Sequence, residues 1–403
     1  MPPLTDLLHS PQHHALMQAT ALAGQALAGR SAEIEAQRCL PQDIADSLAA
    51  AGLYRLLTPA AFGGHEAPPA SFYRVIELLA RADAATAWCC FISCTASLLA
   101  AYLPAAEAAA LFGRPALKAA GVFAPRGRAV PATQAGVAGL RISGRWAWGS
   151  GTHNADIITA GCVLMGADGQ PALPAALQAD GALRVLSVVL DRAQVRLLDN
   201  WDSFGLCGTG SGEFEVVDAF VPLARTASLF DGPRVDTPLY RFPVFGLLAI
   251  AIAAVATGVA REALDHFIVE AGRAVPQAST KPLASKPTVQ EAVARAEARL
   301  QSARAWLLAT VDAAWLAAQQ PGALPVAHRR DLRLAATHAV QSSAEVVNRV
   351  YTLAGGGAVF AASPLQRALR NVQVTTQHMM VNDATYELTG RLLLGVPTQV
   401  TML

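Results

Sequence analysis

A block of short β-forming runs interrupts a sequence whose pattern is otherwise helical. From about residue 117 to 225, turns of Gly, Pro, Asp and Asn separate runs such as LRISGRWAW, DIITAGCVLM and GEFEVVDAFVP. Before residue 115 and after residue 240, apolar residues instead recur three and four positions apart, as in helices. Because strands and helices do not alternate, this pattern argues against a Rossmann or α/β-barrel architecture.

The change in pattern also divides a chain of 403 residues, which is too long for one small domain. We predict an α+β fold with an N-terminal helical domain over residues 1–115, a middle β domain over 116–228 and a C-terminal helical bundle over 229–403. Within the bundle, the apolar spacing predicts four helices, at about 240–271, 287–319, 325–354 and 364–394.

Charge is sparse and balanced along the chain. Charged residues make up 15% and hydrophobic residues 53%, and 31 Lys and Arg against 30 Asp and Glu give a net charge of +1. This composition excludes a disordered chain and provides no broad basic field for nucleic acid or an anionic membrane. So few charges indicate that other subunits cover part of the surface, so we expect an oligomer.

Two uncharged runs, residues 84–106 and 242–260, are each about as long as a bilayer-spanning helix. They are rich in Ala, Thr, Ser, Cys and Gly, and neither has flanking Lys/Arg asymmetry. We therefore expect no membrane span here, but helices buried on all sides inside a helical oligomer.

The six cysteines form no CxxC pair and no Cys/His spacing of a zinc site, so we predict no metal. The N-terminus does not resemble a signal peptide, which favours a cytoplasmic location with reduced thiols.

No Walker loop, HExxH or GxSxG motif occurs, and the glycines of GLCGTGSGEF precede a strand instead of opening a helix. That stretch therefore fails the test for a dinucleotide-binding fingerprint.

The stretch SGRWAWGSGTHNAD combines aromatic and small residues between two predicted strands. Trp146 and Trp148 can wall a flat ring, while Gly149, Ser150 and Gly151 allow close backbone approach and offer N–H and hydroxyl groups. The alternative interpretation is an ordinary hairpin whose tryptophans belong to the core.

The C-terminal block contains a triple glycine and a lone histidine on an apolar helix. Gly355, Gly356 and Gly357 suit a turn that lies close to a ligand or a neighbouring chain, or simply a helix end. His378 is either a functional group or a satisfied core histidine.

These motifs, in this order, resemble the acyl-CoA dehydrogenase fold superfamily over nearly the whole chain. The resemblance is carried by PQDIADSLAAAGLYRLLTPAAFGG, SGRWAWGSGTHNADIITAG, GLCGTGSGEFEVVDAFVP and LAGGGAVF followed by PLQRALRNV. It implies an N-terminal helical domain, a middle β-barrel and a C-terminal four-helix bundle, with flavin between barrel and bundle in a homotetramer.

The chain departs from the dehydrogenases where they carry the carboxylate that removes the acyl α-proton. Counted from Arg370 and Asn371, that position holds Met379, and no acidic residue occurs between Phe242 and Arg261. An R-x-F-G flavin motif is also missing near residues 271–281. These absences count against acyl-CoA oxidation.

His378, beside Met379, is instead typical of the flavin-dependent two-component monooxygenase branch, which includes dibenzothiophene monooxygenase and the 4-hydroxyphenylacetate and secosteroid hydroxylases. The resemblance implies reduced flavin (FMN or FAD) from a separate NAD(P)H:flavin reductase, O2 as co-substrate, and hydroxylation of a small aromatic or heteroaromatic substrate through a C4a-hydroperoxyflavin. Two alternatives stay open: an acyl-CoA dehydrogenase or related FAD-dependent oxidoreductase with an unrecognised base, and a non-catalytic scaffold of the same fold.

Within this resemblance the candidate residues take three roles. His378 is expected to act as base toward the substrate, and Ser150 to hold flavin N5 and C4a in a dry pocket. The candidate substrate-binding residues are Trp88, Phe91, Cys94, Trp146 and Met379. The candidate cofactor-binding residues are Phe123, Trp148, Gly149, Ser150, Thr209, Arg261, Lys281, Gly355, Gly356 and Arg367. Among them, Arg261, Lys281 and the glycines 355 to 357, with Arg367 from a neighbouring subunit, are the candidates for binding the flavin phosphate. Cys94 has core packing as its alternative, and each arginine an ordinary ion pair.

Overall fold

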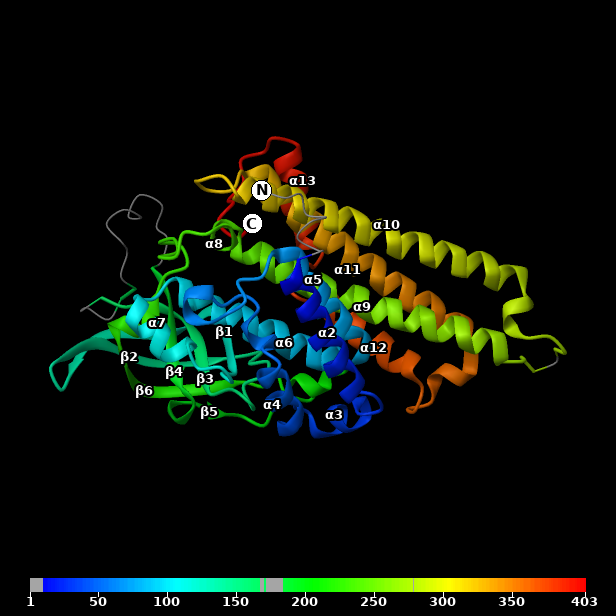
Figure 1. Cartoon of the computed structure of the whole chain (residues 1–403), viewed down its shortest axis with the longest axis horizontal. Helices are drawn as coiled ribbons and strands as arrows, with labels where there is room; N and C mark the ends of the chain where they lie inside the picture. The colour runs from blue at the N-terminus through cyan, green and yellow to red at the C-terminus, as the bar shows by residue number, and fades with distance from the viewer. Residues whose placement is uncertain (1–9, 167–169, 172–183, 278) are drawn as a thin grey trace.

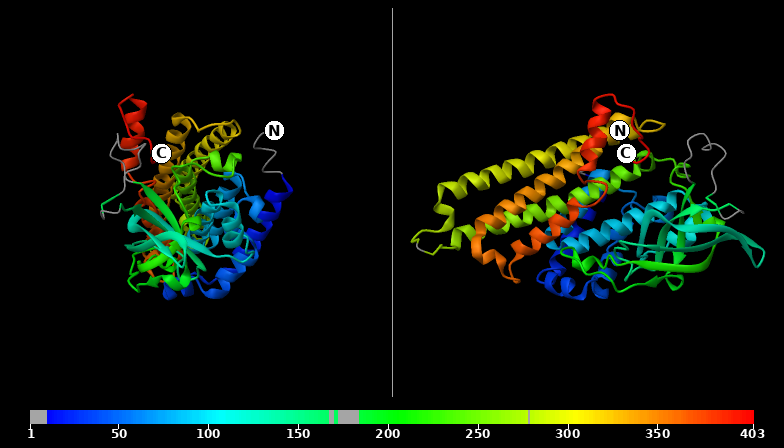
Figure 2. Two further views of the ribbon diagram at one scale, coloured as in Figure 1. Left: turned by 90° about the vertical axis from the view of Figure 1, so that its left-hand side faces the viewer. Right: turned by 180° about the vertical axis from the view of Figure 1, so that it is seen from behind.

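A computed structural model of the chain describes residues 10–166, 170–171, 184–277 and 279–403. Helices, then strands, then helices follow one another along the chain, so the predicted α+β class is confirmed. In Figure 1 the sheet lies at one end of the molecule and the C-terminal helices extend away from it. Figure 2 shows the same separation from behind.

The N-terminal helices pack between the sheet and the C-terminal helices. They are α2 (Pro11–Ala26), α3 (Ser31–Gln37), α4 (Gln42–Ala50), α5 (Pro69–Ala82), α6 (Ala84–Ser97) and α7 (Ala105–Phe112). Helix α6 begins at a capping residue, because the Asp83 carboxylate accepts from the Thr86 N–H (2.7 Å) and hydroxyl (2.8 Å). Almost every residue of α6 is buried, as an all-apolar helix requires.

Among the described residues the strands form one seven-stranded sheet in the order β5-β6-β2-β1-β3-β4-β7. They are β1 (Ala119–Gln134), β2 (Val137–Trp146), β3 (Ile157–Leu164), β4 (Val185–Asp191), β5 (Arg196–Leu197), β6 (Phe214–Pro222) and β7 (Thr226–Ala227). Strand β1 runs parallel to β3, and the other pairs are antiparallel. The turn from β1 to β2 is formed by Ala135 and Gly136, whose φ angles of 49° and 79° suit a tight hairpin.

The sheet curls towards a barrel. Three strands separate β6 from β4 in the sheet order, yet the two strands contact each other. The Gln194 amide, just after β4, also donates to the Phe220 carbonyl of β6 (3.0 Å). Strands β5 and β7 form the two edges, and β1, which contacts α6, is bent by a bulge between Val122 and Gly127.

The C-terminal bundle contains α9 (Val244–Arg273), α10 (Pro287–Ala318), α11 (Val326–Ala354) and α12 (Pro364–Thr376), with the short α8 (Pro238–Arg241) before it and α13 (Ala384–Leu393) after it. The N-terminal helices share one hydrophobic core with this bundle, and the sheet interior forms a second core. Ile92 of α6 packs against both cores, so α6 joins the two halves of the molecule. A Cβ at Gly258 would lie 2.4 Å from the Glu77 carbonyl oxygen, so glycine is needed for α9 to approach α5 this closely.

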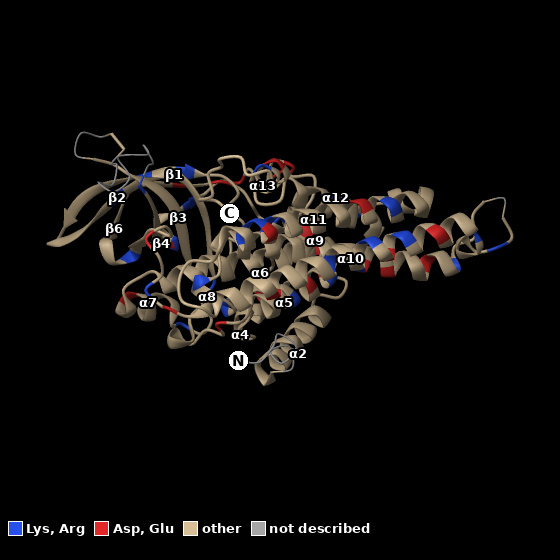
Figure 3. Ribbon diagram, turned by 90° about the horizontal axis from the view of Figure 1, so that it is seen from above, with Lys and Arg blue, Asp and Glu red and all other residues tan. Residues whose placement is uncertain are grey.

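Two described helical segments, Ala84–Ala101 and Val244–Arg273, are long and apolar enough to cross a membrane, but 94% and 83% of their apolar windows lie buried inside this one chain. Their prediction as buried helices is confirmed. The single chain already supplies the burial that we expected from an oligomer, because α9 packs against α5, α11 and α12. Charges of both signs are spread along α10, and most of the ribbon in Figure 3 carries neither sign.

Three of the four predicted bundle helices are confirmed, but the prediction of one continuous helix over 364–394 was wrong. The chain breaks between Thr376 and Ala384 into α12 and α13. The hydroxyls of Thr375 and Thr376 bond to the carbonyls three residues earlier (2.6 and 2.7 Å), which competes with helix continuation. The structure therefore places His378 in a turn after α12 and not on a helix.

Candidate functional site

An aromatic cluster lies where α6 meets the turn after α12. The Trp88 ring packs edge-on against Phe91, with centroids 4.8 Å apart, and against the His378 imidazole, with centroids 5.9 Å apart. Trp88 and Phe91 are one helical turn apart on α6, so the same face presents both. The structure thus brings together two predicted substrate-binding residues and the predicted catalytic histidine.

The Trp88 indole also connects this cluster to Ser150. Its Nε1–H donates to the Ser150 hydroxyl (3.1 Å), and Ser150 lies in the loop that follows β2. From Ser150 a row of short hydroxyl contacts continues to Ser211 (2.6 Å) and on to Thr209 (2.6 Å). Thr209 ends the short helix η5 (Cys207–Thr209) and is 2% exposed, so this row is buried.

The His378 imidazole is neutral near pH 7. Burial, and secondarily the positive charge of Arg333, lower its pKa from the ordinary 6.5 to about 4. The Met380 backbone N–H donates to Nδ1 (3.2 Å), so the proton of the neutral ring is on Nε2. In this form His378 offers a hydrogen-bond donor on Nε2 to a group beside it.

Arg333 of α11 holds the turn that carries His378. Its guanidinium donates to the Met380 carbonyl (3.0 Å), the Met379 carbonyl (3.5 Å) and the Met402 carbonyl. The side chain is 3% exposed, and burial lowers its pKa to about 10. A buried cation that bonds to carbonyls after the end of α12 acts as a C-terminal cap.

The loop after β2 carries an exposed aromatic side chain in a strained backbone conformation. Trp148 has φ of 63°, in the left-handed region that L side chains rarely adopt, and its side chain is 70% exposed. The Gly149 N–H donates to the Gly212 carbonyl (2.9 Å), and the Gly151 N–H donates to the Thr209 carbonyl (3.0 Å). These bonds hold the loop against the segment before β6, and local strain of this kind occurs at binding sites.

Two predicted substrate-binding residues make their contacts outside this cluster. Trp146 is fully buried in the sheet interior, where it stacks on Phe214 with centroids 5.1 Å apart and donates to the Gly161 carbonyl (2.8 Å). The Cys94 thiol points to the Leu53 carbonyl (3.2 Å) and is completely buried, as its core-packing alternative requires. Met379, by contrast, is next to His378 and 60% exposed.

The predicted phosphate-binding residues lie on the bundle, and the arginines among them are paired. Arg261 bonds to Glu297 (2.6 Å) and Asp265 (2.7 Å), and Arg367 bonds to Glu35 (2.9 Å). These are the ordinary ion pairs of the alternative interpretation.

Lys281, Gly355 and Gly356 belong to segments at the end of the bundle furthest from the sheet: the α9–α10 connection and η8 (Gly355–Val359) (Figure 1). The 13 residues of α12 span about 20 Å and separate η8 from the turn of His378. A Cβ on Gly355 or Gly356 would meet nothing within 4 Å. One chain therefore does not bring these residues to Ser150, whereas Phe123 lies in the β1 bulge and packs against the helical core.

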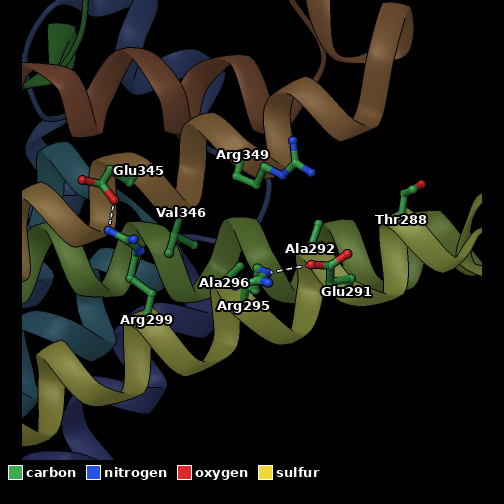
Figure 4. A pocket seen from close by; sticks show the side chains of 9 residues that line it. All are labelled: Thr288, Glu291, Ala292, Arg295, Ala296, Arg299, Glu345, Val346 and Arg349. Atoms are coloured by element: carbon green, nitrogen blue, oxygen red, sulfur yellow. Dashed lines mark hydrogen bonds and ion pairs between the residues drawn. The ribbon is translucent and has the colours of Figure 1, made fainter.

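A surface groove of about 410 Å³ lies between α10 and α11, away from the aromatic cluster (Figure 4). Arg295 and Arg299 on this groove pair with Glu291 (2.8 Å) and Glu345, so most of its charge is compensated. Its lining contains no histidine or cysteine and a single hydroxyl, that of Thr288, and we assign no chemistry to it. Within the described residues, no group of His, Cys, Asp and Glu has the arrangement of a metal site.

Sequence reasoning missed Ser211 and Arg333. Ser211 had a local signal, since Thr209 and Ser211 alternate with glycines directly before a strand. Arg333 had none, because the carbonyls it holds are 46 or more residues further along the chain. Among the described residues, no carboxylate hydrogen-bonds to Trp88, Ser150 or His378, in agreement with the missing dehydrogenase base.

Comparison with known proteins identifies the family of this chain. Family models of the acyl-CoA dehydrogenase N-terminal and C-terminal domains match residues 10–119 and 250–383. The indole-3-acetate monooxygenase of Pseudomonas putida is 32% identical over 395 residues, which cover 98% of this chain and 96% of that protein. This chain belongs to the flavin-dependent monooxygenases of the acyl-CoA dehydrogenase fold. The predicted family and enzyme class are confirmed.

Other proteins are similar to this chain over most of its length. The indole-3-acetate monooxygenase of Acinetobacter baumannii is 30% identical over 90% of both chains. Among solved structures, the 3-HSA hydroxylase from Rhodococcus sp. RHA1 has a TM-score of 0.86 at 26% identity and covers 97% of this chain and 99% of its own. XiaF from Streptomyces sp., in complex with FADH2 and glycerol, has a TM-score of 0.87 at 25% identity, with 97% and 98% covered.

Proposed function

We propose that this monooxygenase hydroxylates a small aromatic acid of the indole-3-acetate type, using O2 and reduced FAD supplied by a separate NAD(P)H:flavin reductase. Two relatives that are at least 30% identical over nine-tenths of the chain are named as indole-3-acetate monooxygenases. FADH2 occurs in the names of a relative and of a structural neighbour, which favours FAD over FMN. A single observation carries the proposal: the Trp88 indole contacts both His378, the candidate substrate-positioning group, and Ser150, the candidate flavin-binding group.

The residues of the loop after β2 fit a flavin ring. Trp148 presents an exposed flat face, and a strained exposed tryptophan is unfavourable unless a ligand covers it. Next to it, the Ser150 hydroxyl accepts one hydrogen bond from Trp88 and has a second lone pair for a ring N–H. Trp148, Gly149 and Ser150 would therefore hold the flavin ring, with Phe123 from the β1 bulge beside them.

The bound flavin would supply the activation of O2, and the chain's own residues supply orientation and a dry environment. Trp88 and Phe91 form an apolar wall beside His378, which suits an aromatic ring and excludes water. Met379, exposed next to His378, would cover the substrate from the other side. Trp146 and Cys94 take no direct part in this proposal because they bond elsewhere.

We assign His378 the role of a donor that positions the substrate, in preference to the base that the resemblance implied. Its Nδ1 accepts the Met380 N–H, so Nε2–H is the group available to a substrate oxygen or carboxylate. Its pKa of about 4 also makes it a weak base. A His378→Gln variant, which keeps an N–H donor, should therefore retain more coupled product than His378→Ala; equal loss in both would favour the base role.

A second copy of the chain would bind the phosphate end of FAD. Lys281, Gly355 and Gly356 lie at the end of the bundle away from Ser150 and can reach a flavin only from a neighbouring subunit, so we propose a homotetramer as the working assembly. A cytoplasmic location suits an enzyme that depends on NAD(P)H, and all six cysteines are free thiols in the structure.

A substrate panel tests the proposed activity. The purified protein, a flavin reductase, NADH and FAD are mixed with indole-3-acetate, 4-hydroxyphenylacetate, resorcinol or dibenzothiophene, and hydroxylated product and H2O2 are measured. We expect the highest ratio of product to H2O2 with indole-3-acetate. Turnover of a phenol or of dibenzothiophene, without turnover of indole-3-acetate, would overturn the substrate assignment and leave the monooxygenase assignment intact.

A further inference from the structure

Four buried side chains from three parts of the fold form one hydrogen-bonded row. Trp88 comes from α6, Ser150 from the loop after β2, and Thr209 and Ser211 from the segment before β6. None of the four is more than 7% exposed. The contacts run from Trp88 Nε1 to Ser150 Oγ (3.1 Å), to Ser211 Oγ (2.6 Å), to Thr209 Oγ1 (2.6 Å) and to the Leu206 carbonyl (2.8 Å).

The two ends of this row set its direction. An indole N–H can only donate and a carbonyl can only accept. If Thr209 donates to Leu206, the Thr209 oxygen receives the Ser211 proton, and the Ser211 oxygen receives the Ser150 proton. All four contacts are then hydrogen bonds, and no buried hydroxyl proton is left without an acceptor.

The opposite order makes fewer bonds. If Thr209 donated to Ser211 and Ser211 to Ser150, the contact from Thr209 to Leu206 would be lost. The Ser150 oxygen would then accept from both Trp88 and Ser211, and its proton would have no acceptor within the row. A buried hydroxyl without its bond is unfavourable, so the first order predominates.

We propose that Ser211 and Thr209 are positioning residues that make the Ser150 hydroxyl a hydrogen-bond acceptor towards the flavin, and thereby favour reduced over oxidised flavin. This inference rests on the proposed function, because it assumes that Ser150 meets flavin N5. In the favoured order the Ser150 proton is directed to Ser211, and one oxygen lone pair is left for the ligand.

The two redox states of flavin differ at the atom concerned. N5 of reduced flavin carries a proton and can donate to the free lone pair of Ser150. N5 of oxidised flavin carries a lone pair instead, so it faces the Ser150 oxygen without a proton between them. Oxidised flavin can gain this bond only if Ser150 gives up its bond to Ser211, which undoes the row.

The test is equilibrium binding of FAD in both redox states. Dissociation constants for anaerobically reduced FAD and for oxidised FAD are measured for the wild-type protein and for Ser211→Ala, Thr209→Val and Thr209→Ser. Ser187→Ala is the matched control, because Ser187 is a buried serine on β4 outside the row. Circular dichroism checks that each variant is folded, and Thr209→Val keeps the shape of the side chain if Ser211→Ala does not fold.

We expect the wild-type protein to bind reduced FAD more tightly, and its preference to fall about fivefold in Ser211→Ala and Thr209→Val, as the loss of one neutral hydrogen bond implies. Thr209→Ser and Ser187→Ala should keep the wild-type ratio within about twofold. If Ser211→Ala and Thr209→Val prefer reduced over oxidised FAD as strongly as the wild-type protein does, this inference alone is overturned. A wild-type protein that binds FAD in neither redox state would instead overturn the proposed function.

Discussion

Trp148 shows at the scale of one residue how function and stability oppose each other. A non-glycine residue at φ of 63° is strained by about 1 kcal/mol, and its exposed ring contributes little packing in return. We predict that Trp148→Gly raises the free energy of unfolding by about 1 kcal/mol and weakens FAD binding about tenfold, because the ring can no longer stack.

Ala135 provides the control for this prediction. It has φ of 49° in the hairpin turn between β1 and β2, with no role in the site. Ala135→Gly should raise the free energy of unfolding similarly, as measured by urea denaturation, and leave FAD affinity unchanged. If Trp148→Gly kept full FAD affinity, the tryptophan would not contact the flavin.

His378 gives a second prediction at this scale. Burial and Arg333 lower its pKa in the folded protein to about 4, whereas in the unfolded chain it is near 6.5. Between these values the unfolded state binds a proton that the folded state does not. The stability from this group is therefore complete above pH 6.5 and is lost as the pH falls towards 4. The full difference is about 3 kcal/mol.

Urea denaturation at pH 7 and pH 4 measures this contribution of His378 to the free energy of unfolding. Between pH 7 and pH 4, the free energy of unfolding should fall by up to about 3 kcal/mol more in the wild-type protein than in His378→Gln, because glutamine does not titrate. Equal losses in the two proteins would mean that His378 is accessible to protons in the folded state.

The sequence motifs led to a large part of this site. Trp88, Phe91, Ser150 and His378 were predicted from sequence, and the structure brings them together. Trp146 was grouped with them because it is close to Trp148 in sequence, but residues two apart on a strand-to-loop path need not face the same way, and its ring points into the sheet. The catalytic and binding roles of all these residues stay predictions.

At the scale of elements, the turn between α12 and α13 is the feature that the sequence pattern concealed. Apolar spacing continues from 364 to 394, so periodicity alone predicts one helix. Besides the local bonds of the Thr375 and Thr376 hydroxyls, a tertiary contact stabilises the break: the buried Arg333 guanidinium donates to the carbonyls of Met379, Met380 and Met402. A partner so distant in sequence is invisible to local patterns, whereas the other bundle helices depend on local spacing and were predicted to within a few residues.

We predict that Arg333→Met loosens this turn. Removing the guanidinium leaves buried carbonyls without donors, which costs about 2 kcal/mol of folding stability. Hydrogen exchange should accelerate in residues 377–383, while the core of α9 stays protected. Arg330→Gln is the control, because Arg330 pairs with its neighbour Asp331 and does not contact the turn. Unchanged exchange in Arg333→Met would show that other contacts hold the turn.

At the scale of the whole molecule, the single chain separates two groups of candidate flavin-binding residues. The residues proposed to bind the flavin ring, Trp148, Gly149 and Ser150, lie in the loop after β2, beside the sheet. The glycines of η8 lie at the far end of the bundle (Figure 1). We predict that light scattering gives a mass near four times the 42.0 kDa of one chain, and that FAD affinity falls when the protein is diluted to monomers. A monomer that binds reduced FAD with full affinity would exclude a shared site.

The central claim, that this chain transfers one oxygen atom from O2 to an aromatic acid, is tested most directly with isotopically labelled oxygen. Protein, flavin reductase, NADH, FAD and indole-3-acetate are incubated under ¹⁸O2, and the product is analysed by mass spectrometry. The account predicts a product that contains one ¹⁸O atom and that forms only when the protein is present. A product that takes its new oxygen from water, or consumption of NADH and O2 that yields H2O2 alone with every aromatic acid offered, would contradict it.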